Sequence, residues 1–135
     1  MINLTELGQK AVTAKYALQK LTTKEKNEAL IHVAKSLVKE ADKLIEANAV
    51  DIKAGEEKGM HSGLLDRLRL TEERIRAMAE GLIQVTELPD PIGEVLESYN
   101  RPNGLQIEKR RVPMGVIGII YESRPNVTAD AFGLC

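Results

Sequence analysis

The residues best suited to chemistry lie in one short polar segment, Tyr-Glu-Ser-Arg-Pro-Asn at positions 121–126. An apolar run precedes this segment and a helix-like run follows it, so we expect it beyond the carboxyl end of a strand, where open α/β sheets bind ligands. Arg124 is suited to pairing with a phosphate or carboxylate, and Asn126 to capping the helix or donating its amide to an oxyanion. Composition alone favours a purely structural interpretation, in which Ser123 or Asn126 caps the helix and Arg124 forms a surface ion pair.

Glycine, cysteine and histidine residues outside this segment indicate packing rather than chemistry. Gly115 and Gly118 form G-x-x-G within the apolar run, which favours close backbone packing over a phosphate cradle. Cys135 has no evident base nearby and is predicted to be a small buried core residue, not a nucleophile. His32 and His61 lie far apart in the sequence, and with a single cysteine the chain is predicted to have no metal site.

Charge balance and the lack of long apolar runs exclude several classes of protein. Lys and Arg number 19 and Asp and Glu number 20, and the net charge of −1 excludes both a nucleic-acid binder driven by bulk charge and a polybasic membrane-surface protein. The basic run at 109–111 would point to alternate faces of a strand, which is typical of a charged hairpin edge. No apolar run reaches membrane-spanning length and the first residues do not resemble a signal peptide, so we expect a cytoplasmic protein without a membrane partner.

The first 88 residues are expected to form helices, because apolar residues recur at intervals of three and four and no proline interrupts them. Thr22 with Glu25 is a capping-box pattern that starts a second helix, expected to continue, with a break, through Asp51. Thr71 is expected to cap a third helix. The apolar stripes of the three helices are Leu4, Leu7, Ala11, Ala14, Leu18 and Leu21; Leu30, Val33, Ala34, Leu37, Val38, Ala41, Leu44 and Ile45; and Ile75, Met78, Leu82 and Val85.

Beyond residue 88 the chain contains all five prolines and is typical of strands. Asn103-Gly104, between the runs 94–99 and 105–111, predicts a hairpin with a type I′ turn, since both residues tolerate positive φ. The run 112–120 has no polar face and is predicted to be a strand buried on both sides, as in parallel α/β sheets. The neighbouring strands would have to come from further sequence or from another chain, and we expect these residues to be the N-terminal part of a larger α/β enzyme.

The stretch 111–131 closely resembles the signature of a known enzyme family. It reads Arg-Val-Pro-Met-Gly-Val-Ile-Gly-Ile-Ile-Tyr-Glu-Ser-Arg-Pro-Asn-Val-Thr-Ala-Asp-Ala and is similar to that of the γ-glutamyl phosphate reductases, also called glutamate-5-semialdehyde dehydrogenases. The resemblance extends through Leu-Asp-Arg-Leu at 65–68 and Leu-Pro-Asp-Pro-Ile-Gly at 88–93, and covers essentially the whole chain. Because this family belongs to the aldehyde dehydrogenase superfamily, the resemblance implies an α/β fold: N-terminal helices, a β-hairpin arm and the first strand and helix of an incomplete Rossmann-like cofactor domain.

The resemblance also implies a domain organisation and a reaction. Residues 1–91 would be the helical N-terminal part of the cofactor-binding domain, 92–111 a hairpin like an oligomerisation arm, and 112–135 the first, truncated βα unit of that domain. The implied reaction, in proline biosynthesis, is the NADPH-dependent reduction of L-glutamyl 5-phosphate to L-glutamate 5-semialdehyde and phosphate. A cysteine thiolate would attack the acyl phosphate, phosphate would leave and hydride would resolve the thioester. That cysteine is expected beyond residue 135, so the chain by itself is expected to be inactive.

The resemblance also implies roles for individual site residues and a partner for the chain. Tyr121 and Glu122 would follow the first cofactor-domain strand and bind the cofactor, and Ser123 and Arg124 are the candidate substrate-binding residues. The oxyanion-donating Asn of the superfamily aligns with Arg124, so Asn126, two residues later, is the candidate donor. The hairpin resembles the arm that pairs with a neighbouring subunit, which implies a homo-oligomer. Two alternatives stay open: a non-catalytic module that associates with itself or with a separate catalytic polypeptide, and a related aldehyde dehydrogenase that acts on another acyl group.

Overall fold

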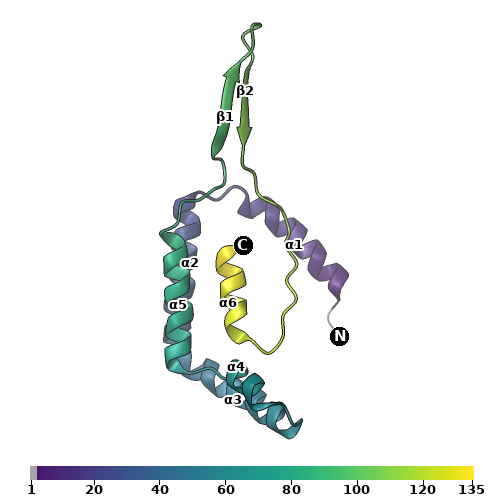
Figure 1. Ribbon diagram of the computed structural model, residues 1–135, viewed down its shortest axis with the longest axis vertical. Coiled ribbons are helices and arrows are strands. Elements are labelled where there is room, and N and C mark those ends of the chain that lie inside the picture. The colour runs from purple at the N-terminus through teal and green to yellow at the C-terminus, as the bar shows by residue number, and fades with distance from the viewer. Residues whose placement is uncertain (1–2) are drawn as a thin grey trace. The chain divides into compact units, whose positions relative to one another are not determined.

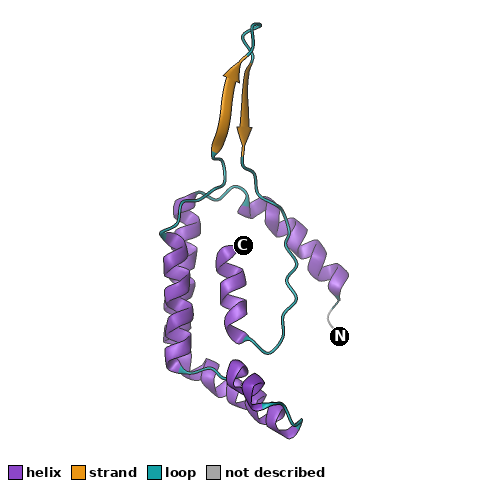
Figure 2. Cartoon of the chain, in the orientation of Figure 1, coloured by secondary structure: helices purple, strands orange, loops and turns teal. Residues whose placement is uncertain are grey.

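The computed structural model describes residues 3–135, which form six helices and two strands (Figures 1 and 2). In chain order the elements are α1 (Leu4–Leu18), α2 (Thr23–Lys39), α3 (Ala41–Glu57), α4 (Ser62–Leu68), α5 (Glu72–Thr86), β1 (Val95–Asn100), β2 (Gln106–Arg110) and α6 (Pro125–Leu134). The chain divides into two compact units. The hairpin unit consists of residues up to Thr23 and of Pro89–Ile117, and the helical unit consists of Lys24–Leu88 and Gly118–Cys135.

The hairpin unit contains the predicted hairpin, with β1 antiparallel to β2. The predicted type I′ turn is wrong, because Gly104 has a φ of 84° but Asn103 does not have a positive φ. The Gly104 N–H donates to the Arg101 carbonyl oxygen at 2.9 Å, as in a type I turn followed by a left-handed glycine. Pro102 favours this turn, since its ring sets φ near the value that the second turn position needs.

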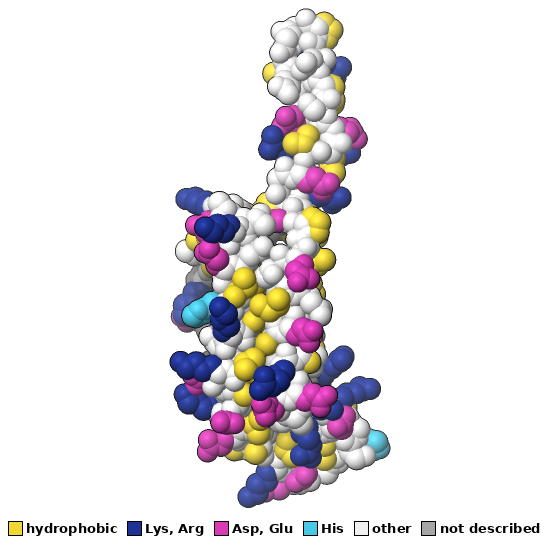
Figure 3. Space-filling view, turned by 90° about the vertical axis from the view of Figure 1, so that its left-hand side faces the viewer, with side chains coloured by type: hydrophobic (Ala, Val, Ile, Leu, Met, Phe, Trp, Pro, Cys, Tyr) yellow, Lys and Arg dark blue, Asp and Glu magenta, His cyan; other side chains and the backbone are white. Residues whose placement is uncertain are grey.

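The basic run of the hairpin is neutralised on the hairpin itself. The ion pairs are Lys109–Glu97 at 3.4 Å, Arg110–Glu108 at 2.6 Å and Arg111–Glu94 at 2.6 Å. Charges of both signs are also interspersed over the helical part of the face drawn in Figure 3. No large area of a single charge is visible on that face.

α1 forms as predicted but leaves its apolar stripe uncovered. Asn3 caps the helix, since its Oδ1 accepts the Thr5 N–H at 3.1 Å. None of the α1 residues is buried, and Leu4 and Leu7 are 76% and 55% exposed. Periodicity therefore predicts this helix correctly, although within residues 3–135 its stripe is at most half-buried.

The core of the helical unit lies between α2, α5 and α6. Leu30 and Ala34 of α2 pack with Ala79 and Leu82 of α5. α6 lies against α5 so closely that a Cβ added to Gly133 would meet the Leu82 Cδ2 at 2.6 Å. The absence of a side chain at this glycine is thus a requirement of the α5–α6 contact.

The remaining helices partly follow the prediction. Thr71 caps α5, because its Oγ1 accepts a first-turn N–H at 3.1 Å, and Ile75 and Met78 are buried as expected. The predicted long second helix is broken at Glu40 into α2 and α3. The short α4 is an element that the periodicity does not identify.

The strand predicted at 112–120 does not form within residues 3–135. These residues form no regular structure, Met114 is 93% exposed and Ile120 is fully exposed. A strand exists only through hydrogen bonds to a neighbouring strand, and the sheet of the described chain consists of β1 and β2. The Rossmann-like part of the expected fold is therefore not formed by residues 3–135.

Cys135 lies at the C-terminal end of α6 and is exposed, so its predicted burial is also wrong. In the part of the chain that the structure describes, no three His, Cys, Asp or Glu side chains gather in a way that would hold a metal ion. No helix among residues 3–135 combines the length and apolar character that crossing a bilayer requires.

Candidate functional site

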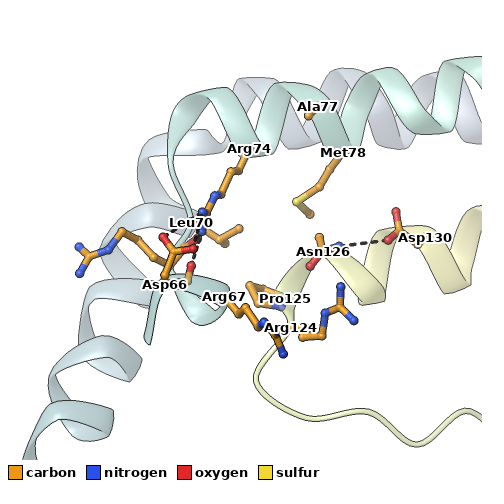
Figure 4. A pocket seen from close by; sticks show the side chains of 11 residues that line it. Asp66, Arg67, Leu70, Arg74, Ala77, Met78, Arg124, Pro125, Asn126 and Asp130 are labelled. Atoms are coloured by element: carbon orange, nitrogen blue, oxygen red, sulfur yellow. Dashed lines mark hydrogen bonds and ion pairs between the residues drawn. The ribbon is translucent and has the colours of Figure 1, made fainter. Parts of the chain in front are cut away.

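The helical unit contains an open pocket of about 370 Å³ beside the N-terminal end of α6 (Figure 4). One wall is the end of α4, the loop after it and the first turns of α5, and the other is the start of α6. The lining residues are Asp66, Arg67, Arg69, Leu70, Arg74, Ala77, Met78, Arg124, Pro125, Asn126 and Asp130.

The start of α6 positions two of the predicted site residues in this pocket. Pro125 occupies the first helical turn, where its missing N–H needs no intrahelical partner. The N-cap residue is Arg124, which makes no side-chain capping hydrogen bond, so the interpretation that Ser123 or Asn126 caps this helix is wrong. Asn126 instead donates from Nδ2 to the Asp130 Oδ2 at 3.2 Å.

Arg74 organises the opposite wall. Its Nη2 donates to both carboxylate oxygens of Asp66, at 3.0 and 3.1 Å, so one nitrogen is shared between the two oxygens. Its Nη1 donates to the Arg69 carbonyl oxygen at 2.8 Å and to the Asp66 carbonyl oxygen. The Asp66 carboxylate therefore has a cationic partner of its own.

Asn48 of α3 holds the same loop from the protein interior. Its side chain is 5% exposed, its Nδ2 donates to the Leu68 carbonyl oxygen at 2.9 Å, and its Oδ1 accepts the Leu70 N–H at 2.7 Å. Leaving such part-buried polar groups unpaired costs about 1–3 kcal/mol each. The backbone on both sides of Arg69 is therefore held in one conformation.

The pocket carries more unpaired positive than negative charge. Arg67, Arg69 and Arg124 form no ion pair with any residue of the described chain. Both lining carboxylates, in contrast, accept hydrogen bonds from neighbouring side chains. Because a guanidinium presents a planar fork that matches carboxylate and phosphate oxygens, the arrangement is suited to binding an anionic group.

Two of the five predicted site residues come together in the pocket. Arg124 and Asn126 line it, and the predicted surface ion pair of Arg124 is not found within residues 3–135. Tyr121, Glu122 and Ser123 precede α6 and do not line the pocket. Ser123 has a φ of 52°, so the chain enters the helix through a left-handed residue.

No pattern in the sequence identifies the α4–α5 wall as part of a site. Nothing in the spacing relates residues 66–74 to residues 124–130, because the two segments meet only in the folded unit. A usable signal was the density of arginines at positions 67, 69, 74 and 76 next to a single nearby aspartate, Asp66.

In comparisons with known proteins, nearly the whole chain is similar to one kind of enzyme. No family model matches the chain. It is 54% identical to the gamma-glutamyl phosphate reductase of Heliobacterium modesticaldum over 100% of its length, and 57% identical to that of Moorella thermoacetica over 95%. The crystal structure of the reductase from Thermotoga maritima matches 98% of the chain with a TM-score of 0.95 at 42% identity, and that from Saccharomyces cerevisiae matches 99% with 0.90 at 30%.

The chain spans about a third of the length of these relatives. It covers 33% of the Heliobacterium protein and 31% of the Moorella protein, and 32% and 34% of the two crystallised chains. The shared part includes the α4–α5 loop, the hairpin and α6, and so contains every residue that lines the pocket.

Proposed function

Because this chain belongs, as an N-terminal region, to the γ-glutamyl phosphate reductase family, we propose that the protein containing it reduces L-glutamyl 5-phosphate with NADPH, giving L-glutamate 5-semialdehyde and phosphate. The observation that carries the proposal is the agreement of nearly the whole chain, in sequence and in backbone, with bacterial and yeast reductases. This step belongs to proline biosynthesis. We also propose that it takes place in the cytoplasm, where an exposed thiol such as that of Cys135 stays reduced.

The described residues do not form a nicotinamide site by themselves. The Tyr121 hydroxyl lies 2.6 Å from the Thr128 Oγ1, Glu122 is exposed, and the run 112–120 forms no strand. NADPH binding is a proposal for the whole protein, to which Tyr121 and Glu122 would contribute from this chain.

For the substrate, the pocket supports roles for Arg124 and Asn126. Arg124 lines a pocket with excess positive charge and would bind the phosphate or carboxylate of L-glutamyl 5-phosphate, with Ser123 next to it in the chain. An asparagine amide carries two N–H groups, and one of those of Asn126 is donated to Asp130. The other would donate to the oxyanion that forms when a cysteine outside these 135 residues attacks the acyl phosphate.

The hairpin supports self-association of the protein. β1 and β2 form the two-stranded sheet of the described chain, so each strand has an outer edge without a strand partner there. Such edges pair readily with a strand of another chain. We propose a homo-oligomer that associates through this hairpin.

The proposal is tested by an enzyme assay of the full-length protein that contains these 135 residues. In the reverse direction, we expect NADP⁺ to be reduced when both L-glutamate 5-semialdehyde and inorganic phosphate are supplied. Reduction that does not depend on phosphate would indicate an aldehyde dehydrogenase acting on another acyl group. No reduction at all would favour the self-association module.

Arg124→Ala in that protein is expected to raise the KM for the group that Arg124 binds. A hydrogen bond to a charged group is worth roughly 1.5–3 kcal/mol, so the increase should be roughly tenfold or more. Arg76→Ala is the matched control, because Arg76 lies on α5 outside this pocket and pairs with Glu72 at 2.6 Å. Unchanged kinetics of Arg124→Ala would exclude this role.

A further inference from the structure

We infer that Arg67 of α4 acts together with Arg124 as a two-arginine clamp for one oxyanionic group of the substrate, either its phosphate or its α-carboxylate. The inference rests on the proposed function for the identity of the substrate. It adds a residue from the helical region to the binding site, whereas the sequence pattern pointed only to the start of α6.

The geometry brings the two arginines to one place. Arg67 comes from the end of α4 and Arg124 from the N-cap of α6, and both line the same pocket. In the view of Figure 4 both side chains lie close to Pro125, at the start of α6. Neither guanidinium has a counter-ion in the described chain, so an anion held in this pocket would be attracted to both.

The carboxylates near the clamp do not neutralise it. Asp66 precedes Arg67 in the chain, but both of its carboxylate oxygens accept from Arg74. Asp130 lies one turn into α6 and accepts from Asn126. Asn126 is uncharged, so Asp130 keeps its negative charge. The lining nevertheless has four arginines against two aspartates, and this excess of positive charge is available to a ligand.

Hydrogen bonds hold the backbone around Arg67 in place. Arg74 bonds to carbonyl oxygens at both ends of the segment that contains Arg67, and buried Asn48 bonds to the backbone at Leu68 and Leu70. A clamp is effective only if its groups are ordered before the ligand arrives, because ordering them during binding costs affinity. Arg74 and Asn48 are thus positioning residues of this site.

The reverse reaction shows which of the two groups the clamp binds, because the phosphate and the α-carboxylate then belong to different substrates, inorganic phosphate and L-glutamate 5-semialdehyde. In the full-length protein, Arg67→Gln and Arg124→Gln are expected to raise the KM for the same one of these substrates, each by roughly tenfold or more. An effect on phosphate assigns the clamp to the phosphate group, and an effect on the semialdehyde assigns it to the α-carboxylate. An effect of the two variants on different substrates overturns the clamp.

Two further variants show whether a change in KM reflects lost binding and not lost folding. Arg67→Lys keeps the charge but not the planar fork, so its KM should lie between those of the unchanged protein and Arg67→Gln. Arg76→Gln, outside the pocket, should leave KM unchanged. If Arg67→Gln melts at the same temperature as the unchanged protein and has the same KM values, the inference is overturned.

Ligand binding without turnover distinguishes this inference from the proposed function. Inorganic phosphate and L-glutamate are used separately as probes, and the melting temperature of the full-length protein is followed. One of them is expected to stabilise the unchanged protein and Arg76→Gln, but not Arg67→Gln or Arg124→Gln. That pattern in a protein without reductase activity would contradict the proposed function and support the anion site. An active reductase in which Arg67→Gln responds to both probes like the unchanged protein would contradict the clamp.

Discussion

Ser123 is held in a backbone conformation that side chains disfavour. Its φ of 52° makes it the one described residue other than glycine with a positive φ. The left-handed conformation costs an L-residue about 1–2 kcal/mol. Ser123→Gly is therefore expected to raise the free energy of unfolding by about 1 kcal/mol, measured by equilibrium unfolding in urea.

Ser123→Ala is the control, because it removes the same hydroxyl and retains the strained φ. It should not gain stability, so equal stability of the two variants would show that strain at this position is unimportant. If the hydroxyl binds the substrate as proposed, both variants raise KM, whereas only the glycine variant is stabilised. Stability and binding are thereby separated at a single residue.

At the scale of elements, the contact between α5 and α6 depends on Gly133. A Cβ at this position would lie 2.6 Å from the Cδ2 of Leu82, which is 2% exposed and has little room to move. Gly133→Ala is expected to lower the free energy of unfolding by about 1–3 kcal/mol, the usual cost of overpacking a core.

Gly81 on α5 provides the opposite expectation. A Cβ there would meet nothing within 4 Å, so Gly81→Ala should raise the free energy of unfolding by roughly 0.5–1 kcal/mol through the better helix propensity of alanine. The two variants make the same chemical change in two helices. Urea unfolding curves that shift in the same direction would contradict the packing account.

The elements also show why some parts of the fold can be predicted from sequence and others cannot. α5 is predictable because its cap at Thr71 and its apolar spacing are local features. The turn at 101–104 is predictable as a turn but not in its type, since Pro102 and Asn103 favour different geometries. The run 112–120 has the composition of a buried strand, but pairing depends on strands that residues 3–135 do not supply.

The candidate site is likewise predictable from sequence only where its residues are neighbours along the chain. The start of α6, with Arg124 and Asn126, is recognisable from a contiguous polar segment after an apolar run. Arg67 is not, because it reaches the pocket only when α4 and the start of α6 are brought together by folding. Sequence patterns report neighbours along the chain, and this half of the pocket is a neighbour only in space.

At the scale of the whole molecule, the run 112–120 leaves apolar side chains on the surface. Ile120 is fully exposed, and exposed apolar patches promote association. The 135-residue chain produced by itself is expected to self-associate. Ile120→Ser should weaken this association by roughly tenfold, since burying a large aliphatic side chain is worth about 1.5–3 kcal/mol.

Size-exclusion chromatography with light scattering over a range of concentrations measures this effect. Val50→Ser on α3 is the control, because Val50 is 68% exposed but lies on a helix outside the run. This variant should associate like the unchanged chain. A sharp monomer of the unchanged chain at all concentrations would contradict the prediction.

The division of the chain into two units has a consequence for how the protein is synthesised. The chain passes from one unit to the other after Thr23, after Leu88 and after Ile117. A nascent chain released as far as Leu88 contains helices of both units and completes neither, since the hairpin and α6 are still to come. The conformational entropy lost in closing such long loops grows only slowly with their length. The late synthesis of these segments therefore affects the order in which the units fold more than their stability. For the same reason, a protease that cuts at any one of the three crossings leaves at least one unit divided between two fragments.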